Sequence, residues 1–311
     1  MSSPQSPVQN LATKIKNHGF VLTALSLMAL IVYLFVSAPP PLPDEALGGA
    51  KIPVAKMFEI LNAENQAVRT RWTQTVGDGK KAGLQFDEHW KDEGVDAGPL
   101  PALFLRETGN SLVKSPTMLR LFLGSDFPIV ASNKLEGIQQ AKLNEIRQDG
   151  KPRFFFDAGT KMYVAMFADH AVASGCVDCH NKHPNSPKTD WKLKDIMGAT
   201  TWAYPKEFVS TEDVLKNIYF LRKGFRGAYE SYLQKAQTFK VKPEIGEKWP
   251  ADGLFMPSLE VFVKSYEQSN STVSLAELTH VIEPNPMRDA TKRLVDGAAK
   301  EDSLKPKEAG L

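Results

Sequence analysis

The only two cysteines of the chain stand three positions apart, and a histidine follows the second at once. The segment reads Cys176-Val177-Asp178-Cys179-His180, which is the CxxCH pattern. In this pattern the two thiols add across the vinyl groups of a haem, and the histidine lies beneath the iron and ligates it. The spacing therefore predicts one covalent c-type haem on Cys176, Cys179 and His180.

Two other functions use similar residues. A dithiol redox pair prefers its first cysteine at the start of a helix in a βαβ setting. Here we expect a strand and loop before the motif and a continuing loop over residues 181–187, which disfavours a redox pair. A zinc site is the second alternative, because His183 extends the pattern to CxxCHxxH. Four ligands within eight residues strain a zinc tetrahedron, since structural sites usually take two ligand pairs from separated segments.

The motif does not settle the ligand on the other side of the iron. We favour His170, which precedes the motif by six positions, and His89, Met57 or an open position are the alternatives. Histidine on both faces gives a lower potential than a histidine and methionine pair, because a thioether favours reduced iron. A methionine such as Met57 is more typical of core filling.

Partners for the haem propionates are expected just beyond the motif. These two carboxylates commonly meet lysine, arginine, tryptophan or tyrosine donors. Lys188 and Trp191 are the candidates, and Lys192 and Lys194 lie next to them. The alternative is that this basic run is a solvated loop.

An uncharged, mostly apolar run extends from Phe20 to Ala38. At about 1.5 Å per helical residue its length is close to the ~30 Å hydrocarbon core of a bilayer. Lys14 and Lys16 precede it and keep the short tail in the cytoplasm. We therefore expect a single-pass anchor in the inner membrane, with the haem domain in the periplasm. A cleaved signal peptide is the alternative, but its apolar core is usually about 7–15 residues long, and the prolines at 39–41 are a poor cleavage context.

The anchor gives the chain a simple order of parts. We expect a cytoplasmic tail over residues 1–19, the transmembrane anchor over 20–38, a linker over 39–50, a haem domain over 51–208, a helical C-terminal extension over 209–295 and a flexible tail over 296–311.

Apolar periodicity predicts the elements around the motif. Helices are expected over residues 51–76, 101–112, 134–148 and 211–239, the last capped by Ser210 or Thr211. Strands are expected over 119–122, 128–131, 153–156, 161–167 and 198–204, and a break over 77–83. Helices and strands mixed in this order predict an α+β domain with an antiparallel sheet.

The overall composition excludes little but does set one class aside. The chain has 311 residues, of which 42% are hydrophobic, and a net charge of +2. Its basic residues are scattered rather than gathered into a stripe, so we expect no nucleic-acid binding.

The segment from Cys176 to Ala199, CVDCHNKHPNSPKTDWKLKDIMGA, closely resembles the CxxCHNxHPxSPKxDWKxGDxxG signature of a PAS-like c-type haem family. That family is known as a domain of unknown function. The similarity extends back through residues 98–102 and Ala168-Asp169, and it covers about residues 50–205. This chain departs from the family at Lys194-Asp195, where a Gly-Asp pair is common, and at His170-Ala171, where many relatives have Lys-Met.

The resemblance implies a PAS-like antiparallel sheet with a long leading helix and flanking helices, and a haem held against the sheet. It also implies a distal ligand from the leading helix, in some members a cysteine. This chain has no cysteine left for that role. Family members occur as stand-alone haem proteins and as periplasmic input domains of signalling receptors.

Three functions fit a covalent haem outside the cytoplasm. We expect one-electron transfer with a redox partner protein. Redox or gas sensing is the alternative, and it needs a separate partner to carry the signal, because only about 19 residues precede the apolar run. A peroxidase-like enzyme needs distal acid–base groups, and the sequence offers no convincing set, so an enzyme is the least favoured of the three.

Overall fold

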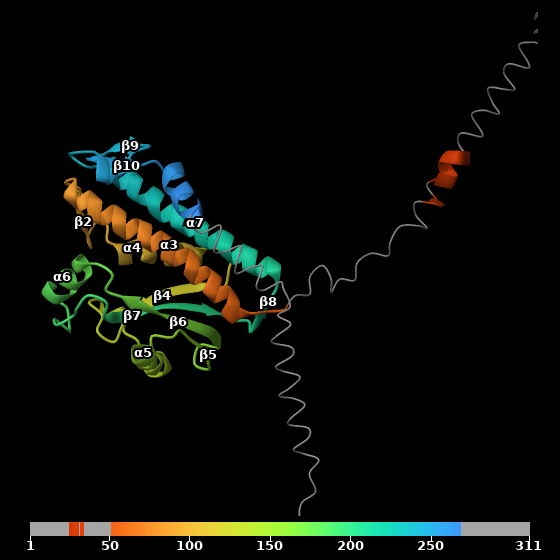
Figure 1. The fold of residues 1–311 in the computed structure, drawn as a ribbon, viewed down its shortest axis with the longest axis horizontal. Helices are drawn as coiled ribbons and strands as arrows, with labels where there is room; N and C mark the ends of the chain where they lie inside the picture. The colour runs from red at the N-terminus through yellow and green to blue at the C-terminus, as the bar shows by residue number, and fades with distance from the viewer. Residues whose placement is uncertain (1–24, 31, 34–50, 269–311) are drawn as a thin grey trace, which may run out of the picture. The chain divides into compact units, whose positions relative to one another are not determined.

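The structure is a computed structural model that describes residues 25–30, 32–33 and 51–268 (Figure 1). The chain divides into two units, Met1–Gly49 and Ala50–Leu311. The described residues of the first unit are helical. No helix among the described residues has the length and apolar character to cross a membrane. Most of the expected anchor over 20–38, and the expected tails and linker, lie outside the described residues.

The second unit is built around a long helix, α3 (Val54–Lys81). It runs further than the sequence predicted, because residues 77–81 continue the helix instead of forming a break. Glycine is needed at position 79, where a Cβ atom would come within 2.9 Å of the ring of Phe86. The chain turns only at Gly83, whose φ of +99° suits glycine.

A four-stranded antiparallel sheet lies against this helix, with its strands in the order β4-β7-β6-β5. The strands are β4 (Arg120–Gly124), β5 (Arg153–Asp157), β6 (Met162–His170) and β7 (Ile196–Tyr204). They confirm four of the five expected strands. The fifth, over 128–131, is wrong: those residues form bends that lead into a short 3₁₀-helix, η1 (Ala131–Asn133).

Helices cover both faces of the sheet (Figure 1). Helices α3, α4 (Pro101–Lys114) and α7 (Thr211–Ala236) lie on one side, and α5 (Gly137–Asp149) lies on the other. The expected alternation along β6 is confirmed. Tyr163, Ala165 and Phe167 belong to the core between the sheet and α3, α4 and α7, whereas the residues between them belong to the core between the sheet and α5. Helices therefore pack on both faces of the sheet, as in an α+β domain.

Short pairs of strands join the ends of these elements. They are β1 (Ile52–Pro53) with β8 (Phe208–Val209), β2 (Phe86–Asp87) with β3 (Gly98–Pro99), and β9 (Glu244–Gly246) with β10 (Phe255–Pro257). A 3₁₀-helix, η2 (Pro250–Asp252), and a helical segment over residues 259–268 complete the described chain.

Helix α7 starts as its sequence predicts. The Ser210 hydroxyl accepts a hydrogen bond from the backbone N–H of Asp213, and the Asp213 carboxylate accepts one from the backbone N–H of Ser210. This capping box satisfies two of the free donors at the helix start. Further along α7, Arg222 forms two hydrogen bonds to the buried carboxylate of Glu64 and so ties α7 to α3.

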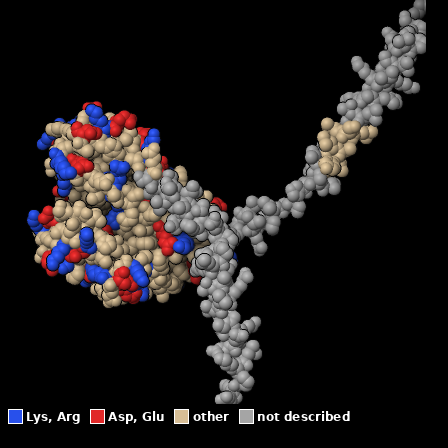
Figure 2. Space-filling model, in the orientation of Figure 1, with Lys and Arg blue, Asp and Glu red and all other residues tan. Residues whose placement is uncertain are grey.

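An aromatic cluster holds α3, α4, α7 and the residues after α7 in one core. Trp72 of α3 stands at its centre, with ring contacts to five other residues of the cluster: Phe86, Phe104, Tyr229, Tyr232 and Phe262. We refer to these six residues as the Trp72 cluster. The surface seen in Figure 2 carries interspersed basic and acidic side chains.

Candidate functional site

The CxxCH motif lies on a helix of its own, α6 (Ser174–Lys182). The expected loop after the motif is therefore wrong as far as Lys182, and Cys176 stands in the first turn of a helix. On a helix, residues three and four positions apart share a face. Cys176, Cys179 and His180 thus project on the same side of α6, and both cysteines are free thiols.

Helix α6 escaped the sequence analysis because it has no buried residue. A helix normally reveals itself by an apolar stripe that faces the core. The face of α6 that would carry such a stripe is made of the two thiols and the imidazole. This is the arrangement expected of a helix whose apolar partner is a prosthetic group rather than the protein core.

Two sets of contacts fix α6 in place. Asn181 at its end exchanges two hydrogen bonds with the backbone of Trp191, both 2.9 Å long. His183, just past the helix, places Nε2 3.0 Å from a carboxylate oxygen of Glu88 and accepts the backbone N–H of Asn185 at Nδ1. The helix is thereby joined to the loop that follows it and to the segment after β2.

The His180 ring suits an iron ligand. Burial lowers the pKa of His180 below its ordinary value, although the negative charge of Asp169 opposes this shift. The lowered pKa favours the neutral imidazole, which is the form that binds a metal. Its buried Nδ1 atom has no hydrogen-bond partner within the described part of the chain. A half-buried ring with one buried, unmatched nitrogen fits a side chain whose environment is completed by a further group.

The thiol of Cys179, the second cysteine of the motif, has a shifted pKa. Burial raises the pKa of this thiol, and the negative charge of Glu88 raises it further. Redox-active CxxC pairs depend on a depressed pKa, because the thiolate is the reactive form. In such pairs the first cysteine has the depressed pKa, so the raised pKa of Cys179 does not decide between a redox pair and a haem site. The position of Cys176 in the first turn of α6 removes one argument against a redox pair.

The zinc alternative finds no support in the geometry. Across residues 25–30, 32–33 and 51–268, no three or more His, Cys, Asp or Glu side chains are grouped as a metal site. Both ring nitrogens of His183, the fourth ligand in that alternative, are already engaged by Glu88 and Asn185.

Trp191 and Lys188, the two candidates for propionate binding, lie side by side. The ammonium group of Lys188 stands 4.8 Å from the centroid of the Trp191 ring and also pairs with Asp190. The indole N–H of Trp191 is buried and has no acceptor among the described residues. It is therefore a donor available to a further group.

The structure separates Met57 from the other two candidates for the distal ligand, His170 and His89. Met57 is fully buried in the first two turns of α3, and its sulfur lies 3.5 Å from the side-chain amide of Asn217. The CxxCH motif lies near the other end of α3, because the positive charge of Lys80, in the last turn of that helix, acts on Cys179. About 35 Å of helix separates positions 57 and 80 at 1.5 Å per residue, so Met57 is wrong as a ligand.

His170 and His89 both lie at the α6 end of the domain. His170 ends β6, and its Nδ1–H donates to the backbone carbonyl of Lys194 at 3.0 Å. This contact leaves Nε2 with a free lone pair, which is the form that binds a metal. His89 is exposed between the carboxylates of Glu88 and Asp92. The distal ligand itself stays a prediction.

Sequence reasoning missed a charged pair whose carboxylate, Asp169, acts on His180. Arg69 of α3 forms an ion pair with Asp169 of β6 and also donates to the hydroxyl of Thr200 on β7, at 3.3 Å. Arg69 and Asp169 are one hundred positions apart, so no local pattern reveals them. Glu88 and its contact with His183 escaped for the same reason.

A sequence-family model described as Tll0287-like matches residues 49–205, about half of the chain. The chain belongs to the Tll0287-like family. This family comprises haem-binding, c-type cytochrome-like domains. In this Tll0287-like chain the matched range contains α3, the whole antiparallel sheet and α6, and it agrees with the range of the sequence resemblance. No curated protein and no solved structure matches the chain.

Proposed function

We propose that this Tll0287-like chain is a membrane-anchored, periplasmic cytochrome with one haem c, and that it transfers single electrons. The haem is held by thioethers to Cys176 and Cys179 and by the imidazole of His180. One observation carries the proposal: two free thiols and an imidazole share one face of a helix that buries no side chain of its own. When bound, the haem supplies an iron that cycles between two charge states.

The other residues of the site have supporting roles in this proposal. The buried indole N–H of Trp191 and the ammonium group of Lys188 receive the propionates. His170 would offer Nε2 as the second iron ligand, while its Nδ1–H donates to the carbonyl of Lys194. A likeness of the sheet to PAS domains stays a prediction.

The setting of the haem domain follows from the N-terminal sequence. The apolar run over 20–38 anchors the chain in the inner membrane, and Lys14 and Lys16 hold its tail in the cytoplasm. A separate redox partner protein exchanges electrons with the haem.

Optical spectra of the purified full chain test the proposed function. For an electron carrier we expect a six-coordinate, low-spin haem in both oxidation states, with a ferrous spectrum that does not change under carbon monoxide. A five-coordinate ferrous haem that binds carbon monoxide readily would contradict electron transfer and favour gas sensing. His170→Ala is the matched variant, because it should open the position and create carbon monoxide binding if His170 is the distal ligand.

The pair of Arg69 and Asp169 should set part of the reduction potential. Asp169→Asn leaves the charge of Arg69 uncompensated near His180, and Arg69→Gln leaves that of Asp169 uncompensated. Because oxidised haem carries one more positive charge, the first change should raise the potential and the second should lower it. The shifts should be on the order of tens of millivolts, since about 59 mV corresponds to 1.4 kcal/mol for one electron.

A redox titration of the two variants measures this effect. The matched control is Lys206→Gln, at the far end of the domain in an ion pair with Asp213, which should leave the potential unchanged. Shifts of the same sign in Asp169→Asn and Arg69→Gln would show that charge is not the cause.

A further inference from the structure

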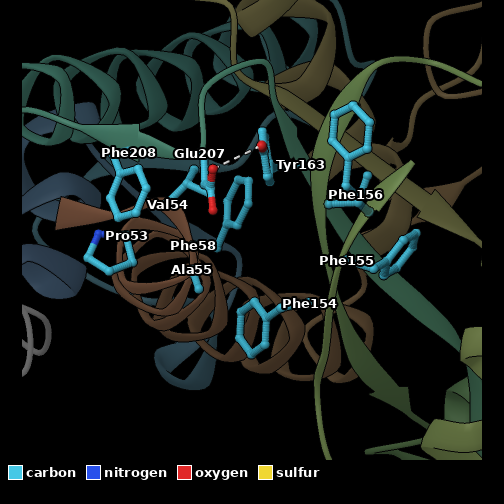
Figure 3. A pocket seen from close by; sticks show the side chains of 11 residues that line it. Pro53, Val54, Ala55, Phe58, Phe154, Phe155, Phe156, Tyr163, Glu207 and Phe208 are labelled. Atoms are coloured by element: carbon cyan, nitrogen blue, oxygen red, sulfur yellow. Dashed lines mark hydrogen bonds between the residues drawn. The ribbon is translucent and has the colours of Figure 1, made fainter. Parts of the chain in front are cut away.

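A second feature of the domain lies at the end of α3 remote from the CxxCH motif. It is an open pocket of about 330 Å³ between the start of α3, the edge strand β5 and the segment before β8 (Figure 3). Its aromatic and apolar lining includes Pro53, Val54, Phe154, Phe156, Tyr163 and Phe208. We call this surface the aromatic pocket.

The aromatic pocket exposes large apolar rings to solvent. Phe154 is 40% exposed, and Phe156 and Phe208 are each 48% exposed. The rings are supported from behind, since Phe154 packs edge-on against Phe167, and Phe156 packs against Tyr163. Grouped exposed aromatic side chains mark an interaction surface more often than scattered ones do.

The carboxylate of Glu207 at the pocket already has a hydrogen-bond partner. Glu207 is the acidic residue of the lining, and its carboxylate accepts a hydrogen bond from the hydroxyl of Tyr163 at 3.3 Å (Figure 3). Lys51, Lys56 and Lys206 each stand within one or two positions of a lining residue in the sequence. Aromatic rings beside lysines are the composition of surfaces that lie at the boundary between lipid headgroups and acyl chains.

The position of the pocket along the chain identifies its occupant. Pro53 and Val54 line it, and only the fourteen residues 39–52 separate Pro53 from Ala38, the last residue of the apolar run. Fourteen residues span about 20 Å as a random coil and at most about 50 Å when fully extended. If residues 20–38 span the bilayer, the aromatic pocket is therefore tethered within that reach of the headgroups.

We propose that the aromatic pocket docks on the phospholipid surface of the membrane that holds the same chain's anchor. This inference rests on the anchor of the proposed function and adds an orientation to it. Phe58 lines the pocket and Lys80 lies near Cys179, and about 33 Å of helix separates the two positions. Docking thus turns α6 away from the bilayer, where a soluble redox partner has access to it.

A photocrosslinking experiment on the full chain in phospholipid nanodiscs tests the docking. Benzoylphenylalanine replaces Phe156 in one variant and Phe208 in another, so that the two probes lie on different elements. The matched control replaces Phe122, which is 37% exposed on β4 but does not line the pocket. After irradiation we expect phospholipid adducts at positions 156 and 208 and none at position 122, as read by mass spectrometry.

Each other outcome overturns the docking in a distinguishable way. Adducts to a second copy of the chain would assign the aromatic pocket and the edge strand β5 to a dimer. Adducts to residues 269–311 would assign the pocket to the chain's own C-terminal segment. A membrane-bound chain without lipid adducts would overturn the docking alone. A chain recovered from cells in the soluble fraction would overturn the proposed anchor, and the docking with it.

Discussion

Replacing both Cys176 and Cys179 with alanine should abolish covalent haem. The chain contains no other cysteine, so the variant has no sulfur that can form a thioether. The two thiols lie one turn apart on the same face of α6, the spacing that thioethers to two vinyl groups require. The wild-type chain should retain haem through a denaturing gel and give a positive pyridine haemochrome test, whereas the double variant should give neither signal.

The control for this experiment lies on the same helix. Ser174→Ala changes the first residue of α6 but leaves the motif and its contacts intact, so it should keep the full haem content. A double cysteine variant that still carries haem after denaturation would disprove attachment through these thiols.

Trp72→Ala should cause the largest loss of stability among single substitutions. Trp72 is 1% exposed, stacks on Phe104 at 5.0 Å between ring centroids, and donates its indole N–H to the carbonyl of Pro99. Alanine would leave a cavity within the Trp72 cluster and an unpaired carbonyl. Truncation of a buried aromatic residue costs about 3–5 kcal/mol, so the free energy of unfolding should fall by about that amount.

Urea unfolding followed by circular dichroism measures this loss. Leu215→Ala, at an exposed position on α7, is the control and should change stability by less than about 0.5 kcal/mol. Because the cluster joins α3 to α7 and to Phe262, both ends of residues 51–268 should unfold in one transition. A loss below about 1 kcal/mol for Trp72→Ala would show that the cluster is not central to the core.

The elements that the sequence predicted well have signals confined to one segment. The strand β6 is visible because residues 162–168 form one short, continuous apolar run, as strands buried on both faces do. The start of α7 is visible because a serine cap and an acidic first turn are local chemistry. The CxxCH motif is readable for the same reason, since all its chemistry lies within five residues.

The features that the sequence missed depend on distant contacts. Residues 77–83 contain three glycines and were therefore predicted to be a break. The sequence does not show that Gly79 lies within α3 and makes room for the ring of Phe86. Residues 128–131 have a strand-like composition but no neighbouring strand to pair with. Met57 was an alternative to the favoured His170, and only the structure shows that it lies in the first turns of α3, far from Cys179.

The candidate site divides in the same way. Cys176, Cys179 and His180 follow from local spacing. Arg69 pairs with Asp169, which acts on His180, but the two residues of this pair are one hundred positions apart in the sequence. Their contact exists only because α3 crosses the sheet near the end of β6. The helical form of α6 was hidden because the face that would reveal it is made of ligating groups.

Intact mass spectrometry of the purified wild-type chain under denaturing conditions tests the central claim most directly. We expect the mass of the chain plus one haem, with no thiol left to titrate. The mass of the bare chain with two reactive thiols, or with a disulfide between Cys176 and Cys179 and no porphyrin, would contradict it.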